Sequence, residues 1–253
     1  LVITSPHNSR IKGIVRLRKR RERDLTGAFI IEGAREVQRA AAAGIDLTAL
    51  YLQTGTSAPP GVETDIVDVT PEVFSKISAR QGPDGVLATA RVWDLGLVDL
   101  AVPATGLVLV AAGIEKPGNL GAMLRTADAA GVDAVVLADP VCDLFGPNVV
   151  RASQGSLFSV QIGAGTSAQV QTWLETTGLA IFPTSPSATA AHWEPDYRSG
   201  SAIVIGSEDT GLSGDWLGTG TPIRIPMVGT ADSLNASVAA GVVLYAAVAA
   251  RSG

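Results

Sequence analysis

The stretch Leu107-Val108-Leu109-Val110-Ala111 is apolar at every position. Similar runs occupy residues 134–137, 179–182, 202–205 and, more briefly, 223–225. A strand that is apolar on consecutive residues is buried on both faces, which is typical of a parallel sheet covered by helices. Helical patterns separate these runs, at 120–130, 167–176 and 235–249. Residues 106–253 therefore predict an α/β domain with a mainly parallel sheet.

Residues 1–92 predict a separate, smaller α/β domain. Strand patterns lie at 28–31, 48–52, 66–69 and 86–92. Asn8 or Ser9 can cap a first helix, and further helices are expected at 34–43 and 71–77. Residues 93–105, which include Pro103, form a connector between the two domains.

Positive charge is concentrated at the start of the chain. Residues 1–35 hold nine of the 19 Lys and Arg residues and three acids, a net charge of +6. The other 218 residues hold ten bases and 21 acids, a net charge of −11. Helical spacing predicts that Lys12, Arg16, Lys19, Arg20 and Arg23 share one helix face. This face is either a solvated surface or a surface that binds a polyanion.

Composition excludes several classes of protein. The longest small-apolar run, residues 236–250, is 15 residues long, and a membrane span needs about 20, so we expect no membrane partner. The polar, basic N-terminus predicts no signal peptide. Cys142 is the only cysteine, which excludes an internal disulfide and favours a cytoplasmic protein. With one cysteine and two histidines, a zinc site is not expected, and we predict no metal-binding residues.

Three glycine-containing clusters each follow an expected strand. They are Asn119-Leu120-Gly121-Ala122-Met123-Leu124-Arg125-Thr126-Ala127, Ile205-Gly206-Ser207-Glu208-Asp209-Thr210-Gly211-Leu212 and Ile225-Pro226-Met227-Val228-Gly229-Thr230-Ala231-Asp232-Ser233-Leu234-Asn235-Ala236-Ser237. Each cluster alone has a structural explanation. The first could start a helix on which Arg125 pairs with Asp128, the second could be a surface turn, and the third could cap a helix. Ligands of open α/β sheets bind beyond the carboxyl ends of the strands, so the joint occurrence predicts one site.

The clusters match the patterns N-x-G-x-x-x-R-T-A, I-G-x-E-x-x-G-L and I-P-M-x-G-x-x-x-S-L-N-x-S. In this order they resemble the three motifs of the SPOUT superfamily, in its TrmH (SpoU) branch of RNA 2′-O-ribose methyltransferases. Arg151-Ala152-Ser153 and Gly155-Ser156 resemble the segment between the first two motifs. Residues 5–92 resemble the small ribosomal-protein-like substrate-binding domain of many members, through the basic helix, Phe29-Ile30-Ile31-Glu32-Gly33 and Arg35.

The resemblance implies a deep trefoil knot in the second domain and S-adenosylmethionine as methyl donor. It implies that Gly206, Ile225, Met227 and Leu234 bind the donor. Arg125 would be the central catalytic residue, with Asn119, Glu208, Ser233 and Asn235 orienting it and the substrate. RNA phosphates would be bound by Arg16, Arg18, Lys19, Arg20, Arg21 and Arg35. A homodimer through the catalytic domain is also implied.

The resemblance favours ribosomal RNA as substrate, with transfer RNA as the alternative and no DNA partner. A non-catalytic RNA-binding protein on the same fold is a second alternative, which the intact motif residues argue against. A dinucleotide-dependent enzyme is disfavoured, because no G-x-G-x-x-G follows the strand at 107–111. Two positions depart from the family pattern: Asn148 replaces a common lysine and Gln161 a common proline.

Overall fold

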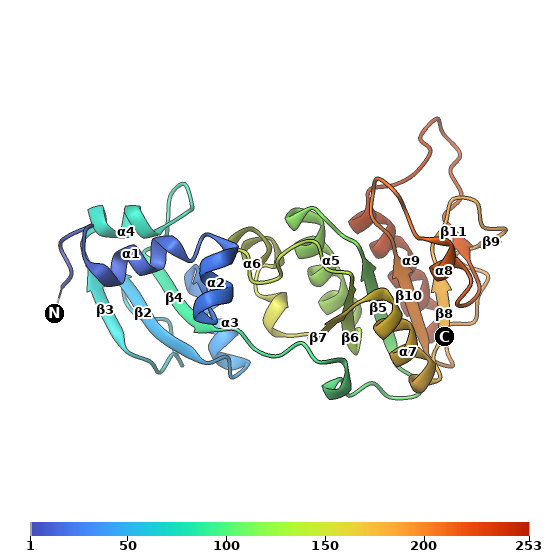
Figure 1. Ribbon diagram of the computed structural model, residues 1–253, viewed down its shortest axis with the longest axis horizontal. Coiled ribbons are helices and arrows are strands. Elements are labelled where there is room, and N and C mark those ends of the chain that lie inside the picture. The colour runs from blue at the N-terminus through green and yellow to red at the C-terminus, as the bar shows by residue number, and fades with distance from the viewer. Residues whose placement is uncertain (1, 253) are drawn as a thin grey trace. The chain divides into compact units, whose positions relative to one another are not determined.

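The computed structural model describes residues 2–252, which fold into two compact units. Unit 1 comprises residues 2–93 together with Asp143–Ser159. Unit 2 comprises Asp94–Cys142 together with residues 160–252. The helices and strands of both are labelled in Figure 1. No helix among the described residues is both long and apolar enough to cross a membrane.

Unit 1 contains a four-stranded sheet in the order β1-β4-β2-β3. β4 is antiparallel to β1 and β2, and β3 is parallel to β2. One face packs against α1 and α4, where Ile11, Ile14, Phe74 and Ile77 are buried with Ile30 of β1. The elements of unit 1 are α1 (Ser9–Arg16), α2 (Arg20–Thr26), β1 (Ala28–Glu32), α3 (Ala34–Ala42), β2 (Leu47–Gln53), β3 (Ile66–Val69), α4 (Pro71–Ile77), β4 (Val86–Arg91), α6 (Pro147–Ser153) and the 3₁₀ turn η2 (Ser156–Phe158).

The basic run does not form one continuous helix face. α1 ends at Arg16 and α2 begins at Arg20, so the shared face predicted from Lys12 to Arg23 is wrong. Arg23 is 5% exposed, donates to the Leu17 carbonyl at 2.6 Å and forms an ion pair with Asp143. The break follows from burial of Leu17 and Arg23, because both side chains pack inside the unit.

The segment Asp143–Ser159 joins β6 to β7 along the chain, yet it packs with unit 1. Side chains alternate across β1, so Phe29 points away from the face that Ile30 occupies. The ring centroids of Phe29 and Phe145 lie 5.1 Å apart, and those of Trp93 and Phe145 4.7 Å apart. Sequence order placed this segment in the 106–253 domain, whereas aromatic packing and the Arg23–Asp143 pair join it to unit 1.

Unit 2 contains a five-stranded sheet in the order β7-β6-β5-β10-β8, with all neighbouring strands parallel. β5, β6 and β10 are buried at every position, which confirms the prediction of a parallel sheet covered on both faces. The elements are η1 (Leu97–Asp99), β5 (Leu107–Ala112), α5 (Pro117–Ala130), β6 (Ala134–Ala138), β7 (Gln161–Gly165), α7 (Ser167–Thr177), β8 (Ala180–Pro183), β9 (Ala190–Ala191), β10 (Ser201–Ile205), α8 (Gly214–Leu217), β11 (Ile223–Arg224) and α9 (Ala236–Ser252).

Alternate residues of the central strands face different helices. Val108, Val110 and Val204 are buried with Leu174 of α7 and Trp216 of α8. α9 packs against α5 and against β10. The run at 223–225 is not a strand of the main sheet: β11 pairs with β9 in a separate two-stranded sheet, and Ile223 forms an isolated parallel bridge with Thr184 after β8.

The expected connector at 93–105 is part of the unit 2 core. Leu97, Leu100 and Val102 pack against the buried cluster of α7 and the sheet. The Gln161 amide accepts from Ala101 N at 3.0 Å and donates to the carbonyls of Ala101 and Asp133 at 3.1 and 3.0 Å. Gln161 therefore fastens the connector to the edge strand β7, a role that a proline side chain cannot perform.

Candidate active site

A cavity of about 290 Å³ opens at the carboxyl ends of the unit 2 strands. The loops after β8, β10 and β11 and the start of α9 form its walls. All four predicted donor-binding residues line it: Gly206, Ile225, Met227 and Leu234. Parallel strands end at the same edge, which explains why clusters distant in sequence meet here. The volume lies at the lower end of the roughly 300–1,000 Å³ typical of small-molecule pockets.

The lining combines apolar walls with a few polar groups. Ile205, Ile223 and Ala236 add to the apolar surface, and Glu208 and Ser233 of the predicted catalytic set also line the cavity. Sequence reasoning missed Thr184 and Ser185, which lie in the loop after β8. The signal was present, because a polar Thr-Ser pair follows the strand expected at 179–182 after one proline, Pro183.

Gly206 is required by the loop itself. A Cβ atom at this position would overlap the backbone of Gly211. The loop folds back on itself, with Gly211 N donating to the Ser207 carbonyl at 3.1 Å and Gly211 at a φ of +66°. Left-handed backbone and close backbone approach both favour glycine. Substitution of Gly206 would therefore disturb the cavity wall before any ligand is considered.

Asn235 connects the first and third motifs. Its amide nitrogen donates to Asn119 Oδ1 at 3.1 Å, which links the start of α5 to the start of α9. Its Oδ1 accepts from the backbone nitrogens of Ser237 and Val238 at 3.0 and 3.4 Å. Asn235 is thus the N-terminal cap of α9, as expected, and at the same time joins two of the clusters.

Two buried polar atoms of the motifs have no hydrogen-bond partner within the part of the chain that the structure describes. They are Asn119 Nδ2 and Glu208 Oε1. Leaving a buried polar group unpaired costs about 1–3 kcal/mol. One donor and one acceptor are therefore open to a ligand in this region.

Arg125 lies on α5 and its side chain is exposed. Across the described chain, its guanidinium forms no hydrogen bond or ion pair, so no salt bridge to Asp128 accounts for it. Arg125 and Asn119 lie six positions apart on the same helix. A free guanidinium offers a planar fork of donors that suits phosphate and hydroxyl oxygens.

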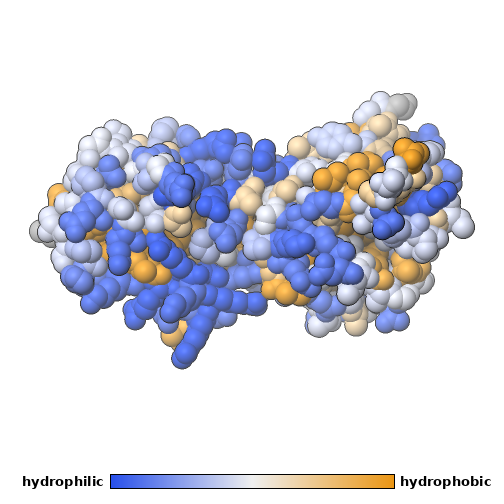
Figure 2. All heavy atoms as spheres, turned by 90° about the horizontal axis from the view of Figure 1, so that it is seen from above, coloured by the Kyte–Doolittle hydropathy of each residue, from blue (hydrophilic) through white to orange (hydrophobic). Residues whose placement is uncertain are grey.

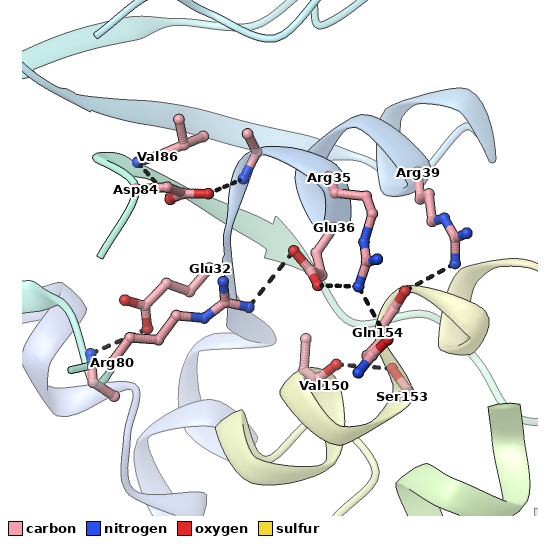
Figure 3. A network of polar contacts seen from close by, with 12 residues as sticks. Glu32, Arg35, Glu36, Arg39, Arg80, Asp84, Val86, Val150, Ser153 and Gln154 are labelled. Carbon is pink, nitrogen blue, oxygen red and sulfur yellow. Dashed lines mark hydrogen bonds and ion pairs between the residues drawn. The ribbon is translucent and has the colours of Figure 1, made fainter. Parts of the chain in front are cut away.

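Several basic residues predicted to bind RNA already have acceptors within unit 1. Arg18 Nη2 donates to the carbonyls of Lys76, Ile77 and Ser78 at 3.0, 3.0 and 2.7 Å, at the carboxyl end of α4. Arg35 bridges Glu36 Oε1 at 3.3 Å and Gln154 Oε1 at 3.1 Å, as Figure 3 shows. Both arginines therefore stabilise the unit, whatever else they contact.

The remaining predicted RNA-binding residues are more available. Arg16 forms a long surface ion pair with Glu22, and Arg20 forms one with Asp24, each at 3.8 Å. Lys19 and Arg21 are exposed. Surface pairs of this kind contribute about 0–1 kcal/mol, so they do not prevent the arginines from binding another anion.

The loop that contains His192 is held by a buried tyrosine. Tyr197 Oη donates to the His192 carbonyl at 2.5 Å, and burial raises the pKa of Tyr197 to about 12, which keeps this donor protonated. Burial lowers the pKa of His192 from its ordinary value of 6.5. His192 does not line the cavity.

Known families match nearly the whole chain. A model of the SpoU rRNA methylase family matches residues 106–245, and a model of the MRM3-like substrate binding domain matches residues 8–88. The 23S rRNA (guanosine(2553)-2′-O)-methyltransferase RlmP of Bacillus subtilis is 30% identical over 246 residues, covering 96% of this chain and 97% of the relative. The 23S rRNA (uridine(2479)-2′-O)-methyltransferase of Streptomyces viridochromogenes is 29% identical, covering 93% and 87%.

Solved structures agree with these matches. A crystal structure of an RNA 2′-O ribose methyltransferase has a TM-score of 0.88 and 41% identity, covering 100% of both chains. The SpoU methyltransferase AviRb of Streptomyces viridochromogenes, in complex with AdoMet, has a TM-score of 0.90 and 27% identity, covering 98% of this chain and 99% of that one. The resemblance drawn from the three motifs is confirmed.

Proposed function

The chain belongs to the SpoU rRNA methylase family, and from this premise we propose that it methylates a ribose 2′-hydroxyl of ribosomal RNA with S-adenosylmethionine as donor. The observation that carries the proposal is that the second and third motifs line one cavity at the sheet edge, while the Asn119–Asn235 hydrogen bond joins the first motif to the third. Relatives that match almost end to end are named as 23S rRNA 2′-O-methyltransferases, which favours ribosomal over transfer RNA.

The residues of the cavity fit the donor. Apolar walls from Ile225, Met227 and Leu234 suit an adenine ring, and the open Glu208 carboxylate suits a positively charged group. When bound there, the donor supplies a methyl group already activated by a sulfonium. The protein then has to align the ribose oxygen with that methyl group and to exclude water.

Arg125 is the residue proposed to act on the substrate. Its guanidinium is free to hold the ribose hydroxyl and a neighbouring phosphate through two parallel donors. An arginine stays protonated in proteins, so positioning and charge stabilisation are its physical role. Asn119 and Asn235, joined to each other at 3.1 Å, and Ser233 at the cavity wall would orient the hydroxyl.

Unit 1 is proposed to bind RNA through phosphates. Arg16, Lys19, Arg20 and Arg21 are exposed on and between α1 and α2 and would contact the phosphates. Arg18 and Arg35 would act mainly by holding α4 and Gln154 in place. Phosphate contacts give affinity and salt dependence with little sequence choice.

We further propose a homodimer through the catalytic unit, in the cytoplasm. α9 buries Ala240, Val243 and Leu244 inside its own unit, while Val238 and Tyr245 are 51% and 50% exposed. Figure 2 shows hydrophobic surface on unit 2, the unit to which α9 belongs. A trefoil knot formed by the segment after β10 is proposed with it, supported by the contribution of that segment to the cavity wall.

The deciding experiment maps ribose methylation in RNA from cells with and without the gene. Loss of one 2′-O-methyl mark in ribosomal RNA, restored by the purified enzyme and labelled donor, is the expected result. Loss of a mark in transfer RNA would move the substrate to that class. Intact marks everywhere, with no transfer to either RNA in vitro, would overturn the proposal.

A further inference from the structure

The charged side chains that line the donor cavity are both acidic. Glu208 comes from the loop after β10 and Asp232 from the segment before α9. No Lys, Arg or His is among the described residues of the lining. The cavity wall therefore presents two acidic side chains and no basic one among its described residues.

One oxygen of the Glu208 carboxylate has no partner among the described residues. Its Oε1 is buried and makes no hydrogen bond within residues 2–252. The nearby hydroxyls of Ser207 and Thr210 bond to each other at 2.8 Å. A buried carboxylate without hydrogen bonds is unfavourable, so a cation in the cavity would recover much of that cost.

The donor and the product of the proposed reaction differ by one charge. During transfer the methyl–sulfur bond breaks with its electron pair left on sulfur, the methyl carbon bonds to the ribose oxygen, and the hydroxyl proton passes to water. S-adenosylmethionine therefore carries a sulfonium that is absent from S-adenosylhomocysteine. Both molecules keep the same ammonium and carboxylate groups.

We propose that Glu208 and Asp232 make the cavity select the sulfonium form, so that they determine the preference for donor over product. This inference rests on the proposed function. Coulomb attraction acts over several ångströms in a partly desolvated site, so the effect does not require direct contact with sulfur. Once the positive charge is lost, the product is held less tightly, which favours its release.

The two carboxylates should contribute unequally. Glu208 is partly buried with one oxygen shielded from water, whereas Asp232 is exposed. Solvent and salt screen an exposed charge more than a buried one. Glu208 is therefore the main determinant, and Asp232 adds a smaller effect that decreases as salt rises.

The test compares dissociation constants for S-adenosylmethionine and S-adenosylhomocysteine by calorimetry. Glu208→Gln should weaken donor binding about tenfold while changing product binding by less than about twofold, and Asp232→Asn should act in the same direction more weakly. Asp209→Asn is the matched control, because Asp209 lies in the same loop but does not line the cavity. It should leave both constants unchanged. Sinefungin, which carries a protonated amine near the sulfonium position, should follow the donor.

Each contrary outcome has a clear meaning. Equal loss of both ligands in Glu208→Gln would show that the carboxylate holds the shared ammonium or shapes the loop, which overturns the inference. Unchanged ratios in both variants would overturn it as well. If the wild-type protein binds the donor and the variants give either of these results, only the charge selection is contradicted. Wild-type protein that binds no donor contradicts the proposed function itself.

Discussion

The two units differ in whether their polar side chains have hydrogen-bond partners. In unit 1, Arg18, Arg23 and Arg35 all donate to carbonyls, carboxylates or amides of the same unit. In unit 2, Arg125 has no acceptor among the described residues, and Asn119 Nδ2 and Glu208 Oε1 are buried without partners. A satisfied arginine stabilises the fold, whereas an open polar group at strand ends is available to a ligand.

This difference shows that the number of basic residues in a segment does not by itself indicate where a ligand binds. The N-terminal segment has the highest density of Arg and Lys, but two of its five predicted RNA-binding arginines, Arg18 and Arg35, have structural roles. Unit 2 is acidic overall, yet its motif arginine, Arg125, is exposed on α5 without an acceptor among the described residues. Position and partners of a charge therefore matter more than its sign.

Arg125→Ala should give the largest effect. If the free guanidinium holds the reacting hydroxyl, methyl transfer should decrease by roughly a thousandfold, as for other removed charge-stabilising donors. Donor affinity and unfolding free energy should stay close to wild type, because Arg125 is exposed and forms no hydrogen bond or ion pair with the described residues. Arg125→Lys should also fail, since an ammonium lacks the planar fork. Single-turnover rates and calorimetry separate the two effects, and substantial transfer by Arg125→Ala would assign catalysis elsewhere.

Arg23→Met should, in contrast, lower the stability of the protein. Arg23 is 5% exposed, and its removal leaves Asp143 and the Leu17 carbonyl without their partner. Breaking a buried ion pair costs about 3–5 kcal/mol. Urea unfolding followed by tryptophan fluorescence measures this loss. Arg21→Met, in the same helix but exposed, is the control and should change stability by less than about 0.5 kcal/mol. Equal stability of the two variants would contradict the assignment of Arg23 as a structural residue.

Substitution of exposed basic residues should affect RNA binding, whereas substitution of basic residues that are hydrogen-bonded within unit 1 should affect stability. Lys19→Ala with Arg21→Ala should weaken RNA affinity several-fold and reduce the slope of log affinity against log salt by roughly 1 to 2 units. Stability should be unchanged. Arg18→Ala should instead lower stability by about 1–2 kcal/mol, because three carbonyls at the end of α4 lose their donor. An unaltered salt slope in the double variant would show that this surface is solvated and does not bind RNA.

His192 tests whether every unpaired polar atom indicates a ligand. Its Nδ1 is buried without a partner, but it lies outside the cavity lining. Burial lowers the pKa of His192 in the folded state below 6.5, so the unfolded chain binds its proton first. The His192 contribution to stability is therefore complete above pH 6.5 and decreases as pH falls toward the folded pKa. His192→Gln should flatten this part of the stability curve slightly, measured by urea unfolding, and leave donor affinity unchanged. A change in donor affinity would extend the site to this loop.

Local patterns in the sequence were sufficient for most elements. Continuous apolar runs predicted β5, β6 and β10, and Thr70-Pro71 predicted the start of α4, whose cap the Thr70 side chain provides. Residues of the second and third motif clusters line one cavity, and the first cluster is joined to the third by the Asn119–Asn235 hydrogen bond. The strands and the helix cap depend on neighbours within a few positions along the chain, so sequence spacing specifies them. β7 and α6 were missed, because β7 is a glycine-containing edge strand and α6 begins after Gly146 without the side-chain cap that marks the start of α4.

Long-range contacts decided the rest. The break between α1 and α2, the packing of Asp143–Ser159 with unit 1 and the pairing of β11 with β9 all depend on partners far away in sequence. Whether an arginine is structural or free depends on the acceptors that folding brings within reach of its guanidinium. The same physical reason applies to Gly206, whose importance lies in the backbone of Gly211 packed against it. Sequence alone determined the strands, the caps and the motifs of this protein, and tertiary structure decided which polar groups were left open to a ligand.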